Sequence, residues 1–84
     1  NIMKEYKLNV YNTLCETAKS CREIHFYDVC RSIGVKHLKT QEVLEIMNKF
    51  IRSNPSYRAV QFIDPKRTAA AQSLFTTLVL TECE

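Results

Sequence analysis

The sequence predicts one α+β domain in which three helices pack against a small β-sheet. Two observations predict this fold class. In three segments apolar residues recur at three- and four-residue steps, which places them on one face of a helix. In two shorter stretches apolar and polar residues alternate, as they do in half-buried strands. Because elements this short are not stable alone, we expect them to share one core.

The first helix is expected from about residue 3 to residue 20, with a single buried stripe. That stripe comprises Met3, the aliphatic stem of Lys7, Val10, Tyr11, Leu14, Cys15 and Ala18. A short strand follows in "REIHF", where Ile24 and Phe26 alternate with polar residues. His25 is therefore expected on the solvent face of this strand, without a catalytic partner.

The second helix is expected at about residues 27–33, where apolar residues such as Val29 and Cys30 share a face. Gly34 follows at the position where a left-handed residue often ends a helix, because glycine adopts positive φ without steric cost. Val35 is expected to fold back on the last turn.

The stretch "KTQEVLEIMNKFIRS", residues 39–53, predicts the most regular helix of the chain. Thr40 is a suitable N-cap. One face of this helix is filled by Val43, Leu44, Met47, Phe50 and Ile51. The helix is expected to end before Pro55, because the residue preceding a proline is disfavoured in helical geometry.

Beyond this helix, "YRAVQFID" alternates through Val60 and Phe62 and predicts a second strand. "DPKR" then predicts a turn or a helix start, with Asp64 as the cap and Pro65 in the first position. The last segment, "TAAAQSLFTTLVLTECE", has helical spacing that continues to Leu78, but its "TTLVLT" also suits a closing strand. We expect a helix in its first half and a strand in its second.

This order of elements is that of a winged helix, with an extra helix or strand at the C-terminal end as an option. Residues 1–84 are expected to form one such domain. The chain starts with Asn1 and has neither a basic-then-apolar leader nor a long apolar run. We therefore expect a fragment of a larger intracellular protein that does not enter a membrane.

The cysteines raise the alternative of a zinc site. Cys15, Cys21 and Cys30 lie close in sequence, with His25 and His37 nearby. Zinc knuckles usually pair ligands separated by two to four residues, and these spacings do not fit. Buried small side chains in a reducing compartment are the expected role, and no metal or cofactor is expected. An enzyme is not expected either, because a glycine-rich phosphate loop and a paired acid–base constellation are both missing from the sequence.

Three stretches resemble a known family: "EIHFYDVCRSIG", "TQEVLEIMNKF" and "YRAVQFIDPKR". Over about residues 6–67 the chain resembles the C-terminal winged-helix domain of the AAA+ subunits of the origin recognition complex and of their gene-silencing paralogue in budding yeast. The resemblance implies a nuclear, chromatin-associated protein. In the origin subunits this domain contacts DNA and neighbouring subunits, and in the paralogue it self-associates. "RTAAAQSLFTTLVL" is also similar to the end of kleisins, whose C-terminal winged helix docks on an ATPase head.

DNA binding by the third helix would use its outward polar residues. Those expected outward are Gln41, Glu42, Glu45, Asn48, Lys49 and Arg52. Glu42 and Glu45 would oppose phosphates, at a cost on the order of 1 kcal/mol each. Glu45 is also well spaced to pair with Lys49. Base reading is thus disfavoured, while DNA contacts remain an alternative for Lys36, His37, Lys39, Gln41, Arg52, Lys66 and Arg67.

Protein binding is favoured by a surplus of apolar side chains. The apolar sector of the third helix spans roughly 160°, whereas a core-facing helix needs about 100°. Leu44, Met47 and Ile51 form its expected centre, so Ile46 and Phe50 are spare. The expected protein interface is Ile46, Phe50, Leu74, Phe75 and Leu78. The sequence thus predicts a non-enzymatic interaction module whose partner is a second copy of itself or another chromatin protein. The alternatives are direct DNA binding, as in a replication initiator, and docking on an ATPase head, as in kleisins.

Overall fold

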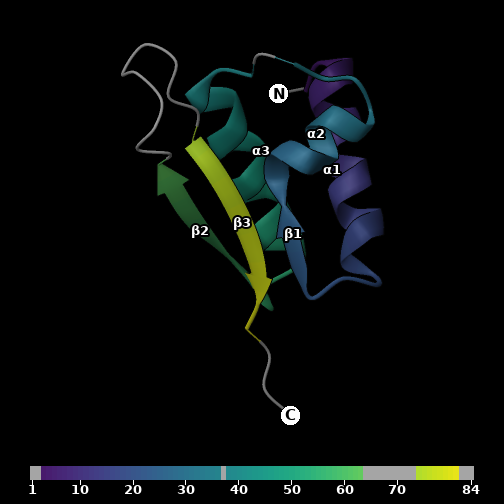
Figure 1. The fold of residues 1–84 in the computed structure, drawn as a ribbon. Coiled ribbons are helices and arrows are strands. Elements are labelled where there is room, and N and C mark those ends of the chain that lie inside the picture. Colours follow the sequence, from purple (N-terminus) through teal and green to yellow (C-terminus); the bar gives the residue numbers. More distant parts are fainter. Residues whose placement is uncertain (1–2, 37, 64–73, 82–84) are drawn as a thin grey trace.

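The computed structural model describes residues 3–36, 38–63 and 74–81, without the side chains of residues 61–63, 74 and 75. Within them the elements follow the predicted order (Figure 1): α1 (Glu5–Ala18), β1 (Glu23–His25), α2 (Phe26–Ser32), α3 (Thr40–Ser53), β2 (Tyr57–Ile63) and β3 (Leu74–Leu80). The predicted α+β class is confirmed: the described residues form three helices and a three-stranded antiparallel sheet, an arrangement compatible with the predicted small winged helix.

Strand β3, the last in sequence, is the central strand of the sheet. It pairs antiparallel with β1 on one side and with β2 on the other, in the order β1-β3-β2. In this register Leu78 lies opposite both Ile24 of β1 and Ala59 of β2. The strand expected in the second half of the C-terminal segment is confirmed. Most of the helix expected in its first half falls on residues 68–73, outside the described residues. Where the first half overlaps β3, from Leu74 to Thr76, the backbone is a strand and the prediction of a helix is wrong.

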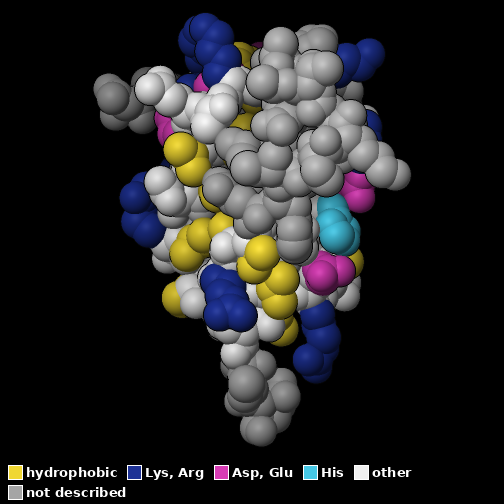
Figure 2. All heavy atoms as spheres, turned by 60° about the vertical axis from the view of Figure 1, so that its left-hand side comes forward, with side chains coloured by type: hydrophobic (Ala, Val, Ile, Leu, Met, Phe, Trp, Pro, Cys, Tyr) yellow, Lys and Arg dark blue, Asp and Glu magenta, His cyan; other side chains and the backbone are white. Residues whose placement is uncertain are grey.

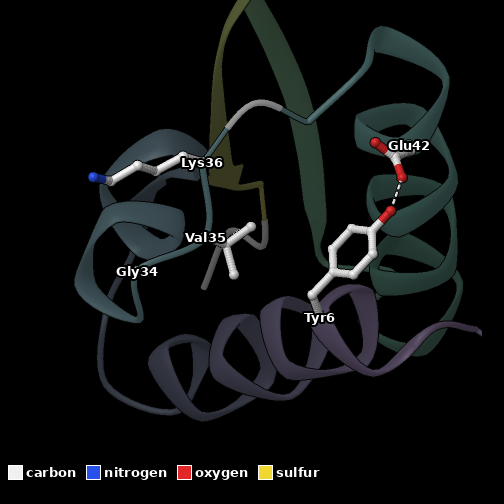
Figure 3. A pocket seen from close by; sticks show the side chains of 5 residues that line it. All are labelled: Tyr6, Gly34, Val35, Lys36 and Glu42. Atoms are coloured by element: carbon white, nitrogen blue, oxygen red, sulfur yellow. Dashed lines mark hydrogen bonds between the residues drawn. The ribbon is translucent and has the colours of Figure 1, made fainter.

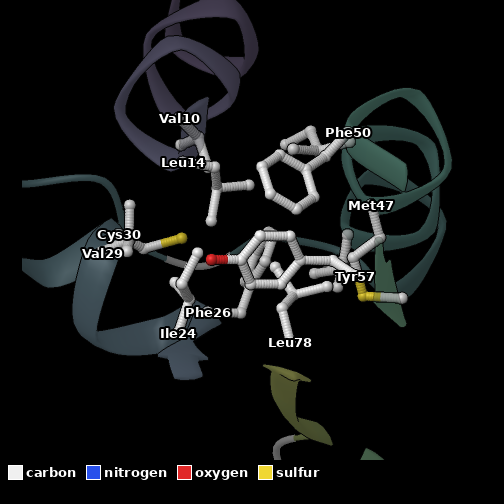
Figure 4. Packing of buried hydrophobic residues seen from close by; sticks show 12 residues of the cluster. Val10, Leu14, Ile24, Phe26, Val29, Cys30, Met47, Phe50, Tyr57 and Leu78 are labelled. Atoms are coloured by element: carbon white, nitrogen blue, oxygen red, sulfur yellow. The ribbon is translucent and has the colours of Figure 1, made fainter. Parts of the chain in front are cut away.

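The core lies between the sheet and the three helices (Figure 4) and takes side chains from every element. Its buried members are Val10, Leu14, Ile24, Phe26, Val29, Cys30, Val43, Ile46, Met47, Phe50, Tyr57 and Leu78. Phe50 meets the ring of Tyr57 edge-on, with the centroids 5.5 Å apart. The Tyr57 hydroxyl donates to the backbone carbonyl oxygens of Ala18, at 3.2 Å, and Cys21. Tyr57 therefore joins β2 to the connection between α1 and β1.

Both ends of the α2–α3 connection have identifiable caps. Gly34 has φ 75°, and its N–H donates to the Arg31 carbonyl oxygen at 3.1 Å, which confirms the predicted left-handed C-cap. The N-cap of α3 is Lys39, and Thr40 is the first helical residue, so the prediction of Thr40 as the N-cap is wrong. Glu42 decides this boundary, because its carboxylate accepts the Lys39 backbone N–H at 2.9 Å.

The buried face of α3 is rotated relative to the face expected from sequence. Ile46 and Phe50, expected as spare surface residues, are each 0% exposed, whereas Leu44, expected at the centre of the buried face, is 38% exposed. The reason is that α3 packs between α1 on one side and β2 on the other. These neighbours bury the sector that contains Val43, Ile46, Met47 and Phe50.

The protein interface predicted from sequence is corrected accordingly. Ile46, Phe50 and Leu78 are core residues with 0% exposure, because α3 turns the first two inward and the central strand β3 buries the third. The side chains of Leu74 and Phe75 lie outside the described part of the chain. No docking surface can therefore be built from the described members of this set.

The rotation of α3 can be tested with two substitutions on the same helix. Ile46→Ala is expected to lower the free energy of unfolding by about 2–5 kcal/mol, because it opens a cavity in the core. Leu44→Ala removes an exposed side chain and is expected to cost less than about 1 kcal/mol. Urea denaturation of both variants measures the difference. Equal losses would contradict the orientation of α3.

Candidate nucleic-acid interface

A row of polar contacts joins α1 to one side of α3. Near the start of both helices, the Tyr6 hydroxyl donates to a carboxylate oxygen of Glu42. One step along, Lys7 Nζ lies 2.8 Å from Glu45 Oε1, and the side chain of Lys7 is only 14% exposed. The aliphatic stem of Lys7 is thus covered, as predicted, while its ammonium group pairs with α3.

The same row continues toward the C-terminal ends of the two helices. The Tyr11 hydroxyl lies 2.8 Å from Ser53 Oγ. Lys49 Nζ stands over the Tyr11 ring, 5.0 Å from its centroid, in a cation–π contact. Contacts therefore follow in the same order along α1 and α3, and together they form what we call the α1–α3 seam: Tyr6, Lys7, Tyr11, Glu42, Glu45, Lys49 and Ser53.

The seam changes which charges α3 offers to a partner. Glu42 and Glu45, which were expected to face outward and to oppose phosphates, are engaged by side chains of α1. The expected Glu45–Lys49 pair is wrong, because Glu45 pairs with Lys7 and Lys49 covers Tyr11. The sequence gives one hint of this arrangement. Lys7 lies on the apolar stripe expected for the first helix, and Glu42 and Glu45 lie three residues apart on the third helix.

The seam also shifts the pKa values of its members. The Tyr6 hydroxyl and, to a lesser extent, the Lys39 backbone N–H donate to the Glu42 carboxylate and hold its pKa below the ordinary value of 4.5. The same hydrogen bond to Glu42 raises the pKa of Tyr6. The hydrogen bond to Glu45 raises the pKa of Lys7. The lowered pKa favours the charged form of Glu42 at neutral pH.

Beside the seam, where Glu45 remains 47% exposed, α3 turns a second set of side chains toward solvent. We call it the free face of α3, and it consists of Gln41, Leu44, Asn48 and Arg52, all of which are exposed. At 100° per residue these four positions fall within an arc of about 80°. No hydrogen bond or ion pair joins the side chains of Gln41, Asn48 or Arg52 to other described residues. Their donors and acceptors are thus available to a ligand.

Two basic residues, Lys36 and Lys39, are exposed in the connection that leads into α3. Lys36, Gly34 and Val35 line an open hollow of about 320 Å³ together with the Tyr6–Glu42 pair (Figure 3). In that view the Lys36 side chain points away from the pair, toward solvent.

Figure 2 turns the β2 side of the molecule forward and shows Lys and Arg side chains beside hydrophobic ones there.

The DNA-contact residues predicted from sequence divide into two groups. Lys36, Lys39, Gln41 and Arg52 are exposed, and they lie on α3 or on the connection that precedes it. His37, Lys66 and Arg67 lie outside the described residues. Asn48, which belongs to the same exposed face, was noted in sequence as an outward residue suited to base contact. The exposure of Leu44 was not predicted from sequence, because it depends on how α3 packs against the rest of the domain.

His25 is exposed, as predicted, but it has polar neighbours that the sequence did not reveal. Its Nδ1 lies 3.3 Å from Thr77 Oγ1, and its Nε2 lies 3.3 Å from Glu23 Oε1. The pairing of His25 with Thr77 across β1 and β3 creates this contact. Thr77 is buried, at 5% exposure, so we build no catalytic site on these residues.

The cysteines of the described chain differ in environment. Cys21 is exposed, Cys15 is half-buried, and Cys30 is buried in the core, where burial raises the pKa of its thiol to about 11. Among the described residues, no three His, Cys, Asp or Glu side chains are grouped so that they could hold a metal ion. His37 and Cys83 fall outside that set.

The hydrogen bonds to Glu42 predict a pH dependence of stability. Because the pKa of Glu42 is lowered in the folded state, its contribution is present above the ordinary value of 4.5 and is lost as the pH falls through the folded value. The wild type is therefore expected to lose more stability than Glu42→Gln between about pH 6 and about pH 3. Tyr6→Phe should reduce the same loss. Parallel pH profiles for wild type and Glu42→Gln in urea denaturation would contradict the seam.

Comparisons with family models, with curated proteins and with solved structures found no match to this chain. The resemblances to origin recognition subunits and to kleisins therefore stay predictions. In the described part of the chain, no helix has both the length and the apolar character needed to cross a membrane.

Proposed function

We propose that this chain is a non-enzymatic winged-helix module that binds duplex DNA, with α3 in the major groove. The observation that supports the proposal is the engagement of Glu42 and Glu45 by α1. Tyr6 and Lys7 hold the two carboxylates on the side of α3 that faces α1, and the ammonium group of Lys7 offsets the charge of Glu45. The face beside them carries amides and one guanidinium. Amide and guanidinium groups are those that pair with base edges and phosphates.

The distribution of cations fits the same partner. Lys36 and Lys39 are exposed beside the N-terminal end of α3, and Arg52 is exposed in its last turn. Cations at both ends of the free face would meet the two phosphate backbones that border a major groove, while the middle of the helix meets the bases. The net charge of +3 gives modest attraction to a polyanion. Nuclear function at chromatin or at a replication origin, which the sequence resemblance implies, is part of this proposal.

Charge reversal at Lys39 tests the proposal. Lys39→Glu is expected to weaken binding to a short fluorescent duplex about tenfold at about 0.1 M salt and to lower the salt slope by about one. The backbone N–H of Lys39 donates the capping hydrogen bond to Glu42 and remains in the variant, so the fold should be retained. Fluorescence anisotropy over a range of salt concentrations measures both quantities.

The matched control is Lys19→Glu, which makes the same charge change at the C-cap of α1. Lys19 is 71% exposed and pairs with Glu16, on a helix that the proposal does not assign to DNA. The effect of Lys19→Glu on the affinity for the duplex should be small. Equal weakening by both reversals would assign the binding to net charge alone, and an absence of duplex binding by the wild type would refute the proposal.

Self-association is a second candidate function, and one observation favours it. Strand β2 is an edge of the sheet, and within the described chain no strand pairs with its outer side. An edge strand of seven residues, such as β2, can pair with a strand from another molecule and so extend the sheet. The exposed charge of Arg58 on β2 works against such pairing.

Sedimentation of the isolated chain separates the second candidate from the first. Self-association through β2 predicts a dimer at about 100 µM, a concentration that populates complexes with a micromolar Kd. A monomer at that concentration would refute self-association and leave the DNA proposal unchanged.

A further inference from the structure

Leu44 is a large aliphatic side chain in the middle of an otherwise polar surface. It is 38% exposed, and it lies between Gln41, one turn before it, and Asn48, one turn after it. A single exposed leucine needs no explanation by itself. Here, however, it stands between two carboxamides, on the surface that the proposed function directs into the major groove. Its contribution there depends on which base edges it meets.

The chemistry of the major groove distinguishes the four base pairs. Asn and Gln pair in bidentate fashion with N6 and N7 of adenine, and apolar side chains contact the C5 methyl group of thymine. Guanine is contacted most often by Arg or Lys. From its first turn onward the free face carries two amides and an aliphatic side chain, whereas Arg52 lies in the last turn. The part of this face from Gln41 to Asn48 therefore matches A·T pairs better than G·C pairs.

The spacing along α3 agrees with such a site. Asn48 lies seven positions after Gln41, which at 1.5 Å per residue amounts to about 10.5 Å along the helix axis. Base pairs rise 3.4 Å along each strand, so the two amides span about three base-pair steps. Leu44 lies between them and would meet a base pair within that span.

We infer that α3 recognises A·T base pairs, with Leu44 against a thymine methyl group and Gln41 and Asn48 on adenines about three steps apart. This inference rests on the proposed function, since it assigns a base preference to the same surface. The cations at the ends of α3 would bind any sequence, and Leu44 would add the discrimination.

Replacement of thymine by uracil isolates the methyl group. The probe is a short fluorescent duplex of alternating dA and dT, compared with the same duplex in which every dT is replaced by deoxyuridine. Loss of one buried methyl group is expected to weaken binding by the wild-type chain about fourfold. Leu44→Ala is expected to bind both duplexes alike, at the level of the wild type on the uracil duplex.

The matched control is Leu8→Ala on α1, because Leu8 is 41% exposed and takes no part in the α1–α3 seam. This variant should keep the full preference for the thymine duplex. Circular dichroism of both variants verifies that they are folded.

The outcomes distinguish the inference from the function on which it rests. Equal binding of both duplexes by the wild type, with Lys39→Glu still weakening both, would refute the thymine contact and keep the DNA-binding proposal. A preference that survives Leu44→Ala would also refute it. Absence of binding to either duplex would refute both.

Discussion

The burial of Ile46 and Phe50 is the constraint on which the other features of α3 depend. Each is 0% exposed, and removal of a side chain of this kind typically costs 2–5 kcal/mol. Exposed ion pairs contribute about 0–1 kcal/mol each. The core therefore sets the rotation of α3 about its axis. The contacts of Glu42 and Glu45 with α1 follow from that rotation, and so does the position of Leu44 on the solvent-exposed face of α3.

The rotation also decides between two kinds of partner. With Ile46 and Phe50 outward, α3 would have presented an apolar strip beside two carboxylates, which suits a protein. With both residues inward, it presents amides and a guanidinium, and its carboxylates are occupied by Tyr6 and Lys7. Neither surface needs a different backbone. A turn of less than half a revolution about one helix axis separates a surface for a protein from a surface for a polyanion.

The order of the elements, the left-handed cap at Gly34 and the late strand could be predicted, because each depends on a local pattern. The rotation of α3 could not. Its apolar residues cover a sector wider than any one neighbour can bury, and hydrophobicity alone does not say whether Leu44 or Ile46 remains outside. The answer depends on α1 and β2, which are distant in sequence. Gln41 and Arg52 could be predicted as outward residues, because helical spacing and polarity are visible in the sequence. The partners of Glu42 and Glu45 could not, because they lie on α1.

The central position of β3 has a consequence for how the domain is made. Ile24 of β1 pairs with Leu78, and β2 has no other strand to pair with in the described chain. A ribosome adds β3 after β1 and β2, so these two strands lack their common neighbour until residues 74–80 have been synthesised. Contacts between residues so far apart in sequence slow folding. The helices can form first, but the nascent chain keeps two unpaired strand edges until its last strand arrives, and that interval is when a chaperone would be most useful.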